Sequence, residues 1–184
     1  MKLLLLTLGL SFHVTTFSQN LKDPIEVTSE LQSKIKQRIE KKDVPKLKLQ
    51  LEKEKYNSIQ IEFTLDTFRV EQFMNSWIDL DYGDFGMRDA AYAAARIYDS
   101  LLNKYYKKLL TVLKPADKKV LTQAQKAWLL FRDSEYKLVE TISKDEYSGG
   151  GTMQQLTESG GYLNMVKIRV IAIFYHYARA THTE

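Results

Sequence analysis

A short run in the second half of the chain brings together residue types suited to recognition. Ala124 to Asp133 reads AQKAWLLFRD, and the triplet Gly149, Gly150 and Gly151 follows further along. The periodicity places an aromatic, a cation and a carboxylate on one helix, and the glycines form a flexible loop after it. We therefore predict contact with a partner, through the candidate binding residues Trp128, Arg132, Asp133, Gly149, Gly150 and Gly151.

The residue types that most catalytic sites need are scarce. The chain has no cysteine, and after the N-terminal segment the first histidine is His176, which lies with His182 in a tail where a solvated role is the default. The acidic stretch DLDYGDFG, from Asp79 to Gly86, lacks the ordered oxygen positions of a calcium loop and favours a solvated turn. We expect no enzyme, cofactor or metal site, although an acid–base hydrolase stays open because its two carboxylates need not be neighbours in sequence.

The same helix also admits a purely structural interpretation. At 100 degrees per residue, Glu135 falls within the apolar stripe and Arg132 at its border. A buried carboxylate needs a counter-ion, so we predict that Glu135 forms a structural ion pair with Arg169, or else with Arg96. Arg132 is placed to lie over the ring of Trp128.

The first residues indicate export. Met1 and Lys2 give a positive start, Leu3 to Leu10 is an apolar core, and Thr16-Phe17-Ser18 supplies small residues before a cut. We predict a signal peptide over residues 1–18 and a periplasmic or secreted mature chain. The apolar run is shorter than the roughly 20 residues of a membrane span, and no later segment approaches that length, so we expect no transmembrane segment after cleavage. An uncleaved anchor or a buried first helix is the alternative.

Charge and composition limit both the fold class and the kind of partner that we expect. The chain carries a net charge of +4 and 44% hydrophobic residues, with 8 glycines and 3 prolines. Few turn formers argue against a sandwich or barrel. Residues 19–84 are slightly acidic and the remainder is basic, a balance too mild and interspersed for nucleic acid. We expect a protein partner, and the sequence does not give the oligomeric state.

Apolar residues repeat at helical spacing along most of the chain. One stripe runs from Ala91 to Val112, a second includes Val120, Ala124, Ala127, Trp128, Phe131, Leu138 and Ile142, and a third runs from Leu163 to Tyr177. The segment 59–80 is apolar on two faces, with a strand at its start as the alternative. We predict an all-α, compact bundle of three to four long helices.

Short helices precede this bundle. Val27, Leu31, Ile35 and Ile39 recur every fourth position, Asp43-Val44-Pro45 then breaks the pattern, and a second short helix extends to Tyr56. We therefore assign residues 19–58 to an N-terminal helical extension, which could equally be a mobile arm, and residues 59–184 to the helical domain.

Three sequence elements in order carry a resemblance to a known family. LNKYYKKLL, AQKAWLLFRDSE and the glycine-rich SGGGTM, followed by Arg169, resemble the lysozyme inhibitor LprI-like family of small exported bacterial helical domains. The resemblance covers about residues 87–177. The matching positions are Gln125, Trp128, Arg132, Asp133, Glu135, Gly149, Gly150 and Arg169. Many relatives have cysteines where this chain has Tyr136 and Gly161 or Tyr162, and a threonine where it has Val166.

The resemblance implies a non-enzymatic inhibitor. It would act by occlusion, with the loop from Tyr147 to Met153 entering the sugar-binding cleft of a lysozyme, and Lys144, Arg132 or the loop amides would face the carboxylates that glycosidase clefts present. The basic net charge gives no steering toward a basic lysozyme. The acidic turn of Asp79, Asp81 and Asp84 would supply complementarity, but the sequence does not place it beside the loop. The alternative is a cell-envelope binding or scaffolding module that docks a second protein through exposed leucines of residues 19–84, which the resemblance does not cover.

Overall fold

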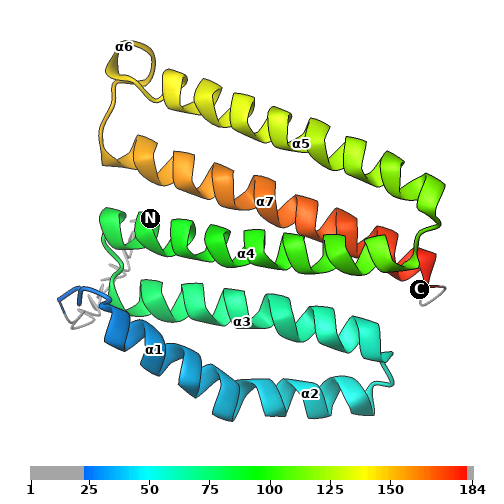
Figure 1. Cartoon of the computed structure of the whole chain (residues 1–184). Coiled ribbons are helices and arrows are strands. Elements are labelled where there is room, and N and C mark those ends of the chain that lie inside the picture. The colour runs from blue at the N-terminus through cyan, green and yellow to red at the C-terminus, as the bar shows by residue number, and fades with distance from the viewer. Residues whose placement is uncertain (1–22, 182–184) are drawn as a thin grey trace, which may run out of the picture.

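The protein is a layered array of antiparallel helices. The computed structural model describes residues 23–181. It contains α1 (Ser29–Arg38), the π-helical turn η1 (Ile39–Asp43), α2 (Val44–Lys53), α3 (Ser58–Leu80), α4 (Asp84–Val112), α5 (Pro115–Ile142), α6 (Asp145–Ser148) and α7 (Thr152–Ala180). The helices lie in the order α5, α7, α4, α3 and α1–α2 (Figure 1). The predicted all-α bundle of long helices is confirmed, and the alternative strand near residue 59 is wrong because that segment is helical. The predicted signal peptide, residues 1–18, lies outside the described residues.

α4 and α7 form the central pair. The α4 face against α7 has small and large apolar side chains, and the α7 face is aliphatic and aromatic. The buried members are Ala94, Tyr98, Leu102, Tyr105, Leu109, Val166, Val170, Ile173 and Phe174. Small residues at one end let the two backbones approach closely. The stripes predicted for these two helices are confirmed in nearly every position, with Val112 exposed.

The N-terminal extension packs against α3. Ile35, Ile39, Val44 and Leu51 are buried in a second core with Phe73 and Trp77. The expected break at Asp43-Val44-Pro45 does not occur, because η1 carries the chain directly into α2 with the proline in its first turn, where no amide hydrogen is needed. The extension is therefore part of the helical array in the described structure.

Charged groups join α3 to its neighbours. Asp66 accepts hydrogen bonds from Lys104 Nζ at 2.5 Å and from the hydroxyl of the buried Tyr105 at 2.8 Å. Glu71 accepts bonds from Tyr98 and, at 2.6 Å, from Lys167. Burial, together with the adjoining carboxylate, raises the pKa of both tyrosines. These bonds satisfy polar groups at the inner faces of the helices and fix their register.

The α5 helix is attached differently. Its predicted core stripe is wrong: Val120, Ala124, Ala127, Phe131, Leu138 and Ile142 are exposed. The helix instead turns Leu121, Gln125, Trp128, Arg132 and Tyr136 toward α7 and α4. Within residues 23–181, Leu121 is the one α5 side chain that is fully buried. Long polar and aromatic side chains, rather than an apolar seam, therefore hold α5 in place.

Candidate functional site

The glycine loop turns the chain from α6 into α7 with an unusual backbone. Gly149, Gly150 and Gly151 have φ angles of 77°, 68° and 90°. These values lie in the region that side chains with a Cβ atom rarely adopt, which explains three successive glycines. The Gly149 amide donates to the Asp145 carbonyl at 3.0 Å, and the Gly150 amide donates to Ser148 Oγ at 3.3 Å.

The loop presents apolar side chains and helix-end amides to solvent. Tyr147 is 61% exposed and Met153 is 62% exposed, one on each side of the glycines. Gly151 caps α7 without a side-chain hydrogen bond, and the Gln154 amide donates to the Gly151 carbonyl at 3.2 Å. The Thr152 and Met153 amides before it lie at the positive end of the helix dipole. The loop can therefore bury two large side chains against a partner while donating hydrogen bonds.

The acidic turn between α3 and α4 lies beside this loop. Thr152 Oγ1 donates to Asp84 Oδ2 at 2.5 Å, and Arg88 Nη1 donates to Gln155 Oε1 at 2.9 Å. Phe85, exposed next to Asp84, lies under the Arg88 guanidinium. No pattern in the sequence indicates this proximity, since it depends on α4 and α7 being neighbours.

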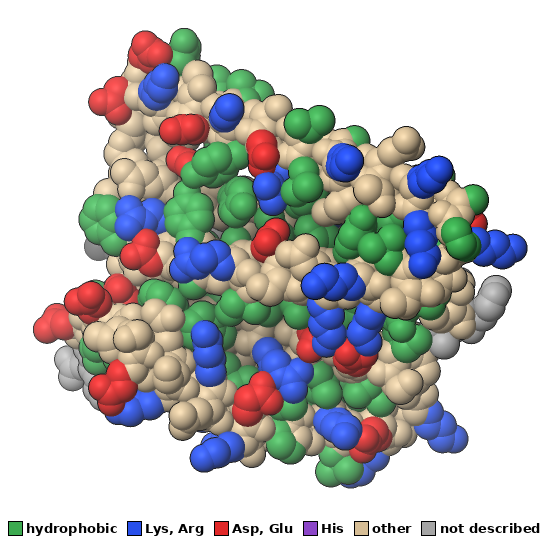
Figure 2. Space-filling view, in the orientation of Figure 1, with side chains coloured by type: hydrophobic (Ala, Val, Ile, Leu, Met, Phe, Trp, Pro, Cys, Tyr) green, Lys and Arg blue, Asp and Glu red, His purple; other side chains and the backbone are tan. Residues whose placement is uncertain are grey.

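Carboxylates accumulate at this end of the molecule. The turn and the loop region contribute Asp79, Asp81, Asp84, Asp89, Asp145, Glu146 and Glu158, against the cations Arg88 and Lys144. Figure 2 shows acidic side chains gathered where α6 and the α3–α4 turn lie, with lysines and arginines prevailing at the opposite end. We call the surface of Asp84, Phe85, Tyr147, Gly149–Gly151 and Met153 the loop end.

Gly150 also has a packing role. A Cβ atom built there would lie 1.8 Å from Asp145 Oδ1, whereas Gly149 and Gly151 have open space around them. A side chain at Gly150 would displace Asp145 and remodel the loop, so it cannot separate binding from loop structure. Tyr147 and Met153 offer the cleaner substitutions because their side chains are exposed.

Two guanidinium groups lie close to the ring of Trp128 at the junction of α5 and α7. The Arg132 and Arg169 guanidinium carbons are 5.4 Å and 5.7 Å from its ring centroid. Arg169 also donates to Gln125 Oε1 from Nε at 3.1 Å and from Nη2 at 3.0 Å. Burial lowers the pKa of Arg169. These contacts clamp α5 onto α7.

Arg132 extends the clamp to α4. Its Nη1 lies 3.6 Å from Asp99 of α4, and its Nη2 lies 2.7 Å from the exposed Asp133 on its own helix. The predicted partner-binding residues thus divide between two places. The glycines lie at the loop end, and Trp128, Arg132 and Asp133 lie near the middle of α5.

The predicted ion pair between Glu135 and Arg169 is wrong, because no such pair within 4 Å forms among the described residues. Arg169 faces Gln125 and Trp128 instead. With a rise of about 1.5 Å per residue, Glu135 lies roughly 10 Å further along α5 than Trp128. The helix projection showed the angular position of Glu135 and not this axial offset.

A tyrosine cluster that the sequence did not suggest joins α4, α5 and α7 nearer the loop end. The hydroxyls of Tyr92 and Tyr136 are 3.4 Å apart, and Tyr92 donates to Glu158 at 3.3 Å. Tyr136 also meets Tyr162 edge to face, with ring centroids 5.2 Å apart. The hydrogen bond with Tyr92 and burial raise the pKa of Tyr136. The cluster braces the C-terminal half of α5.

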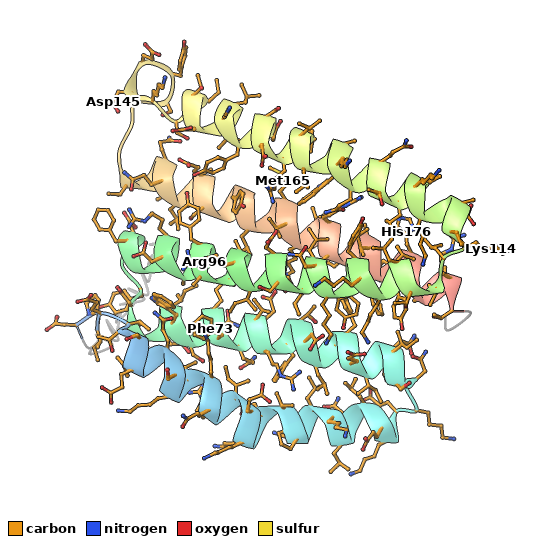
Figure 3. The ribbon with its side chains drawn as sticks, viewed as in Figure 1. Phe73, Arg96, Lys114, Asp145, Met165 and His176 are labelled. Atoms are coloured by element: carbon orange, nitrogen blue, oxygen red, sulfur yellow. The ribbon has the colours of Figure 1, made fainter. Side chains whose placement is uncertain are left out.

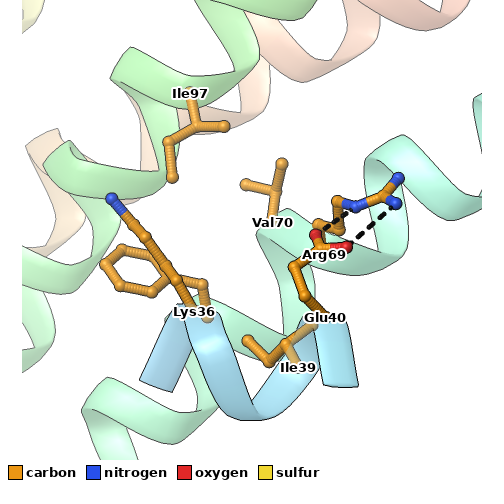
Figure 4. A pocket seen from close by; sticks show the side chains of 7 residues that line it. Lys36, Ile39, Glu40, Arg69, Val70 and Ile97 are labelled. Atoms are coloured by element: carbon orange, nitrogen blue, oxygen red, sulfur yellow. Dashed lines mark hydrogen bonds and ion pairs between the residues drawn. The ribbon is translucent and has the colours of Figure 1, made fainter. Parts of the chain in front are cut away.

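A small apolar hollow lies on the other side of the molecule, between α1, α3 and α4. It measures about 240 Å³ and is lined by Ile39, Val70, Phe73 and Ile97, with Lys36 and the Glu40–Arg69 ion pair at its rim (Figure 4). No described group of three or more His, Asp or Glu side chains is arranged to hold a metal ion. The residues that line the hollow do not form a recognisable catalytic or metal-binding group, so the loop end remains the candidate site.

Comparison with known proteins agrees with the resemblance. Residues 81–172 match the family described as lysozyme inhibitor LprI. The matched region begins at the acidic turn and includes α4, α5, the glycine loop and most of α7. No curated protein and no solved structure matches the chain. Over residues 23–181, no helix is both long enough and apolar enough to span a membrane.

Proposed function

Because the chain belongs to the lysozyme inhibitor LprI family, we propose that it inhibits a lysozyme by inserting its loop end into the sugar-binding cleft. The observation that carries this proposal is the meeting of the glycine loop, exposed apolar side chains and the acidic turn at one end of the bundle. The action is steric occlusion, and the protein itself performs no chemical step.

The loop offers donors for a glycosidase cleft. Such clefts present two carboxyl groups that flank the scissile bond. The Thr152 and Met153 amides at the start of α7 and the exposed Lys144 are hydrogen-bond donors close to the glycines, and bonds to ionised carboxylates are stronger than neutral ones. Tyr147 and Met153 would contact the apolar walls that normally hold sugar rings.

The carboxylates around the loop end would attract a basic lysozyme electrostatically, although the net charge of the whole chain would not. The whole chain is basic at +4, which disfavours approach to a basic lysozyme. The loop end has the opposite sign locally, so it would orient the inhibitor with its loop toward a cationic enzyme surface. Because charges at exposed positions are screened over about 10 Å at 0.1 M salt, inhibition of a basic lysozyme should weaken as salt rises.

Substitution at the loop end tests the proposal. We expect Tyr147→Ala and Met153→Ala to raise the inhibition constant of the mature chain toward a basic lysozyme at least tenfold each, about 1.4 kcal/mol, as for anchor residues at interfaces. Tyr175→Ala removes an equally exposed aromatic side chain from the C-terminal half of α7 and serves as the matched control. Full inhibition by both loop variants, or no inhibition by the wild type in large excess, would remove the proposal.

The envelope-scaffold alternative has less support. It requires free leucines on the N-terminal extension, yet Leu51 is buried and Leu47 is partly buried against α3, while Leu49 is exposed. Export to the periplasm or beyond remains a prediction from residues 1–18, and it would place the inhibitor in the compartment where lysozyme acts.

A further inference from the structure

The exposed face of α5 is an apolar stripe that nothing in the described structure covers. Val120, Phe131, Leu138 and Ile142 are 66%, 55%, 53% and 51% exposed, and Ala124 and Ala127 lie between them on the same face. We call these six residues the α5 stripe. A contiguous apolar stripe of this length is unusual on a monomer's surface and typically marks an interaction site. Their spacings are four, three, four, seven and four residues, with Ser134 in the longer gap, and this periodicity is that of a helix-pairing seam.

From Ala127 onward the stripe is separate from the face that holds α5 in the molecule, while Val120 and Ala124 border a hollow shared with α4 and α7. Gln125, Trp128 and Arg132 face α7 and α4, about 70° to 130° around the helix from the centre of the stripe at 100° per residue. The stripe is therefore free to pack without disturbing the clamp.

The order of large and small residues along the stripe fits a second, antiparallel copy of itself. With Val120 opposite Leu138 of the second copy, Phe131 falls opposite Ala127 and Ala124 falls opposite Ser134. Each large side chain then meets a smaller one, which allows the close interdigitation that pairs of helices need. A two-fold axis would pass near Leu130, the most exposed apolar residue of α5. A parallel pairing would instead place Phe131 against Phe131.

Charge favours the same arrangement. The start of α5 has a net charge of +2, from Lys114, Lys118 and Lys119 against Asp117, and its end has −1, from Glu140, Asp145 and Glu146 against Lys137 and Lys144. Figure 3 shows Lys114 and Asp145 at opposite ends of the helix. An antiparallel partner sets the basic end of each copy beside the acidic end of the other, whereas a parallel partner would set like charges together.

We propose that the protein forms a two-fold symmetric dimer through the α5 stripe, with the two α5 helices antiparallel. The interface is isologous, so the same residues serve both copies and the assembly closes at two. The antiparallel geometry directs the two loop ends to opposite ends of the dimer. Each copy can then engage a separate partner molecule.

Mass measurement tests the dimer. By light scattering after size-exclusion chromatography, we expect the mature chain to have twice the monomer mass and Phe131→Glu to have the monomer mass. Tyr175→Glu places the same charge at an exposed aromatic on α7 and should remain dimeric. Circular dichroism checks that each variant is folded. A wild type that is monomeric at all concentrations overturns the proposal, and so does a wild type that gains mass only when another protein is added. A folded Phe131→Glu variant that remains dimeric also overturns it.

Crosslinking tests the register, and the absence of cysteine from the chain makes single cysteines informative. Leu130→Cys places the two thiols within about 3 Å of each other along the helix axis, while Val120→Cys separates them by about 27 Å. A short bismaleimide should therefore link Leu130→Cys into dimers and leave Val120→Cys unlinked. The reverse pattern would indicate a parallel pair and refute the proposed geometry.

Phe131→Glu should keep full inhibition per chain while Tyr147→Ala stays dimeric, so failure of the dimer and failure of the inhibitor function are distinguishable.

Discussion

Replacement of Trp128 by alanine separates a structural role from partner contact. The partly buried indole contributes about 2 kcal/mol, roughly half the cost of removing a fully buried large aromatic. The two guanidinium groups at 5.4 Å and 5.7 Å add about 0.5–1 kcal/mol each. The clamp should therefore lose about 3 kcal/mol. Within the described residues α5 buries Leu121 alone, so this loss falls on the attachment of α5 and spares the α4–α7 pair.

Hydrogen exchange followed by mass spectrometry measures this loss by segment. A decrease of about 3 kcal/mol in the free energy of local opening corresponds to roughly 100-fold faster exchange. We expect that acceleration in peptides from α5, with exchange in the buried centre of α4 and α7 unchanged. Lys126→Ala, a substitution at an exposed position of the same helix outside both the clamp and the α5 stripe, serves as the control for effects on helix propensity.

The opposite pattern would refute this reasoning. If exchange in α5 stays at the wild-type rate while inhibition is lost, Trp128 contacts the partner directly and the clamp contributes little to holding α5. Exchange that accelerates equally in every helix would show that α5 is part of one cooperative unit with the central pair.

Two further predictions concern stability. Gly86→Ala should lower the free energy of unfolding by roughly 1–3 kcal/mol in urea, because its Cβ would lie 2.2 Å from Asp81 Cγ and 2.4 Å from the Asp81 carbonyl oxygen. Gly83→Ala is the control and should be tolerated, since the nearest atom to its Cβ is 3.7 Å away. Equal stabilities of the two variants would contradict the packing of this turn. Burial alone would raise the pKa of Glu62, but hydrogen bonds from Lys104 at 2.8 Å and Lys108 at 2.6 Å outweigh it and lower the pKa below 4.5. Stability from Glu62 is thus present above pH 4.5 and is lost as the pH falls through the lowered folded-state pKa. The advantage of the wild type over Glu62→Gln should therefore shrink in that range, and a gap that stays constant down to pH 2 would argue against the coupling.

The apolar periodicity of the sequence correctly predicted the buried faces of α4 and α7. It predicted the wrong face for α5. In α4 and α7 the apolar stripe coincides with the buried face, because each helix is covered by apolar neighbours. In α5 the stripe is equally regular, yet Phe131 and Leu138 face solvent. Periodicity reports that one face of a helix is apolar, and it does not say whether that face meets the same chain, a second copy or another protein.

The candidate site shows the same division. The glycine triplet was recognisable because backbone angles near φ +70° are a local requirement, and its conformation follows from the residue type. The partners of Arg169 were not predictable, since they depend on which turn of α5 lies opposite.

The sequence by itself determined the helical class, the absence of disulfides, the glycine loop and the family, since each depends on residue types and spacings along the chain. The tertiary structure alone decided that the acidic turn lies against the glycine loop and that the N-terminal helices cover α3. It also decided that α5 turns a face of aromatic and long polar side chains inward and leaves its apolar stripe exposed. These outcomes depend on the axial offset between antiparallel helices, which is set by side-chain packing across the whole array and has no local signature in the sequence.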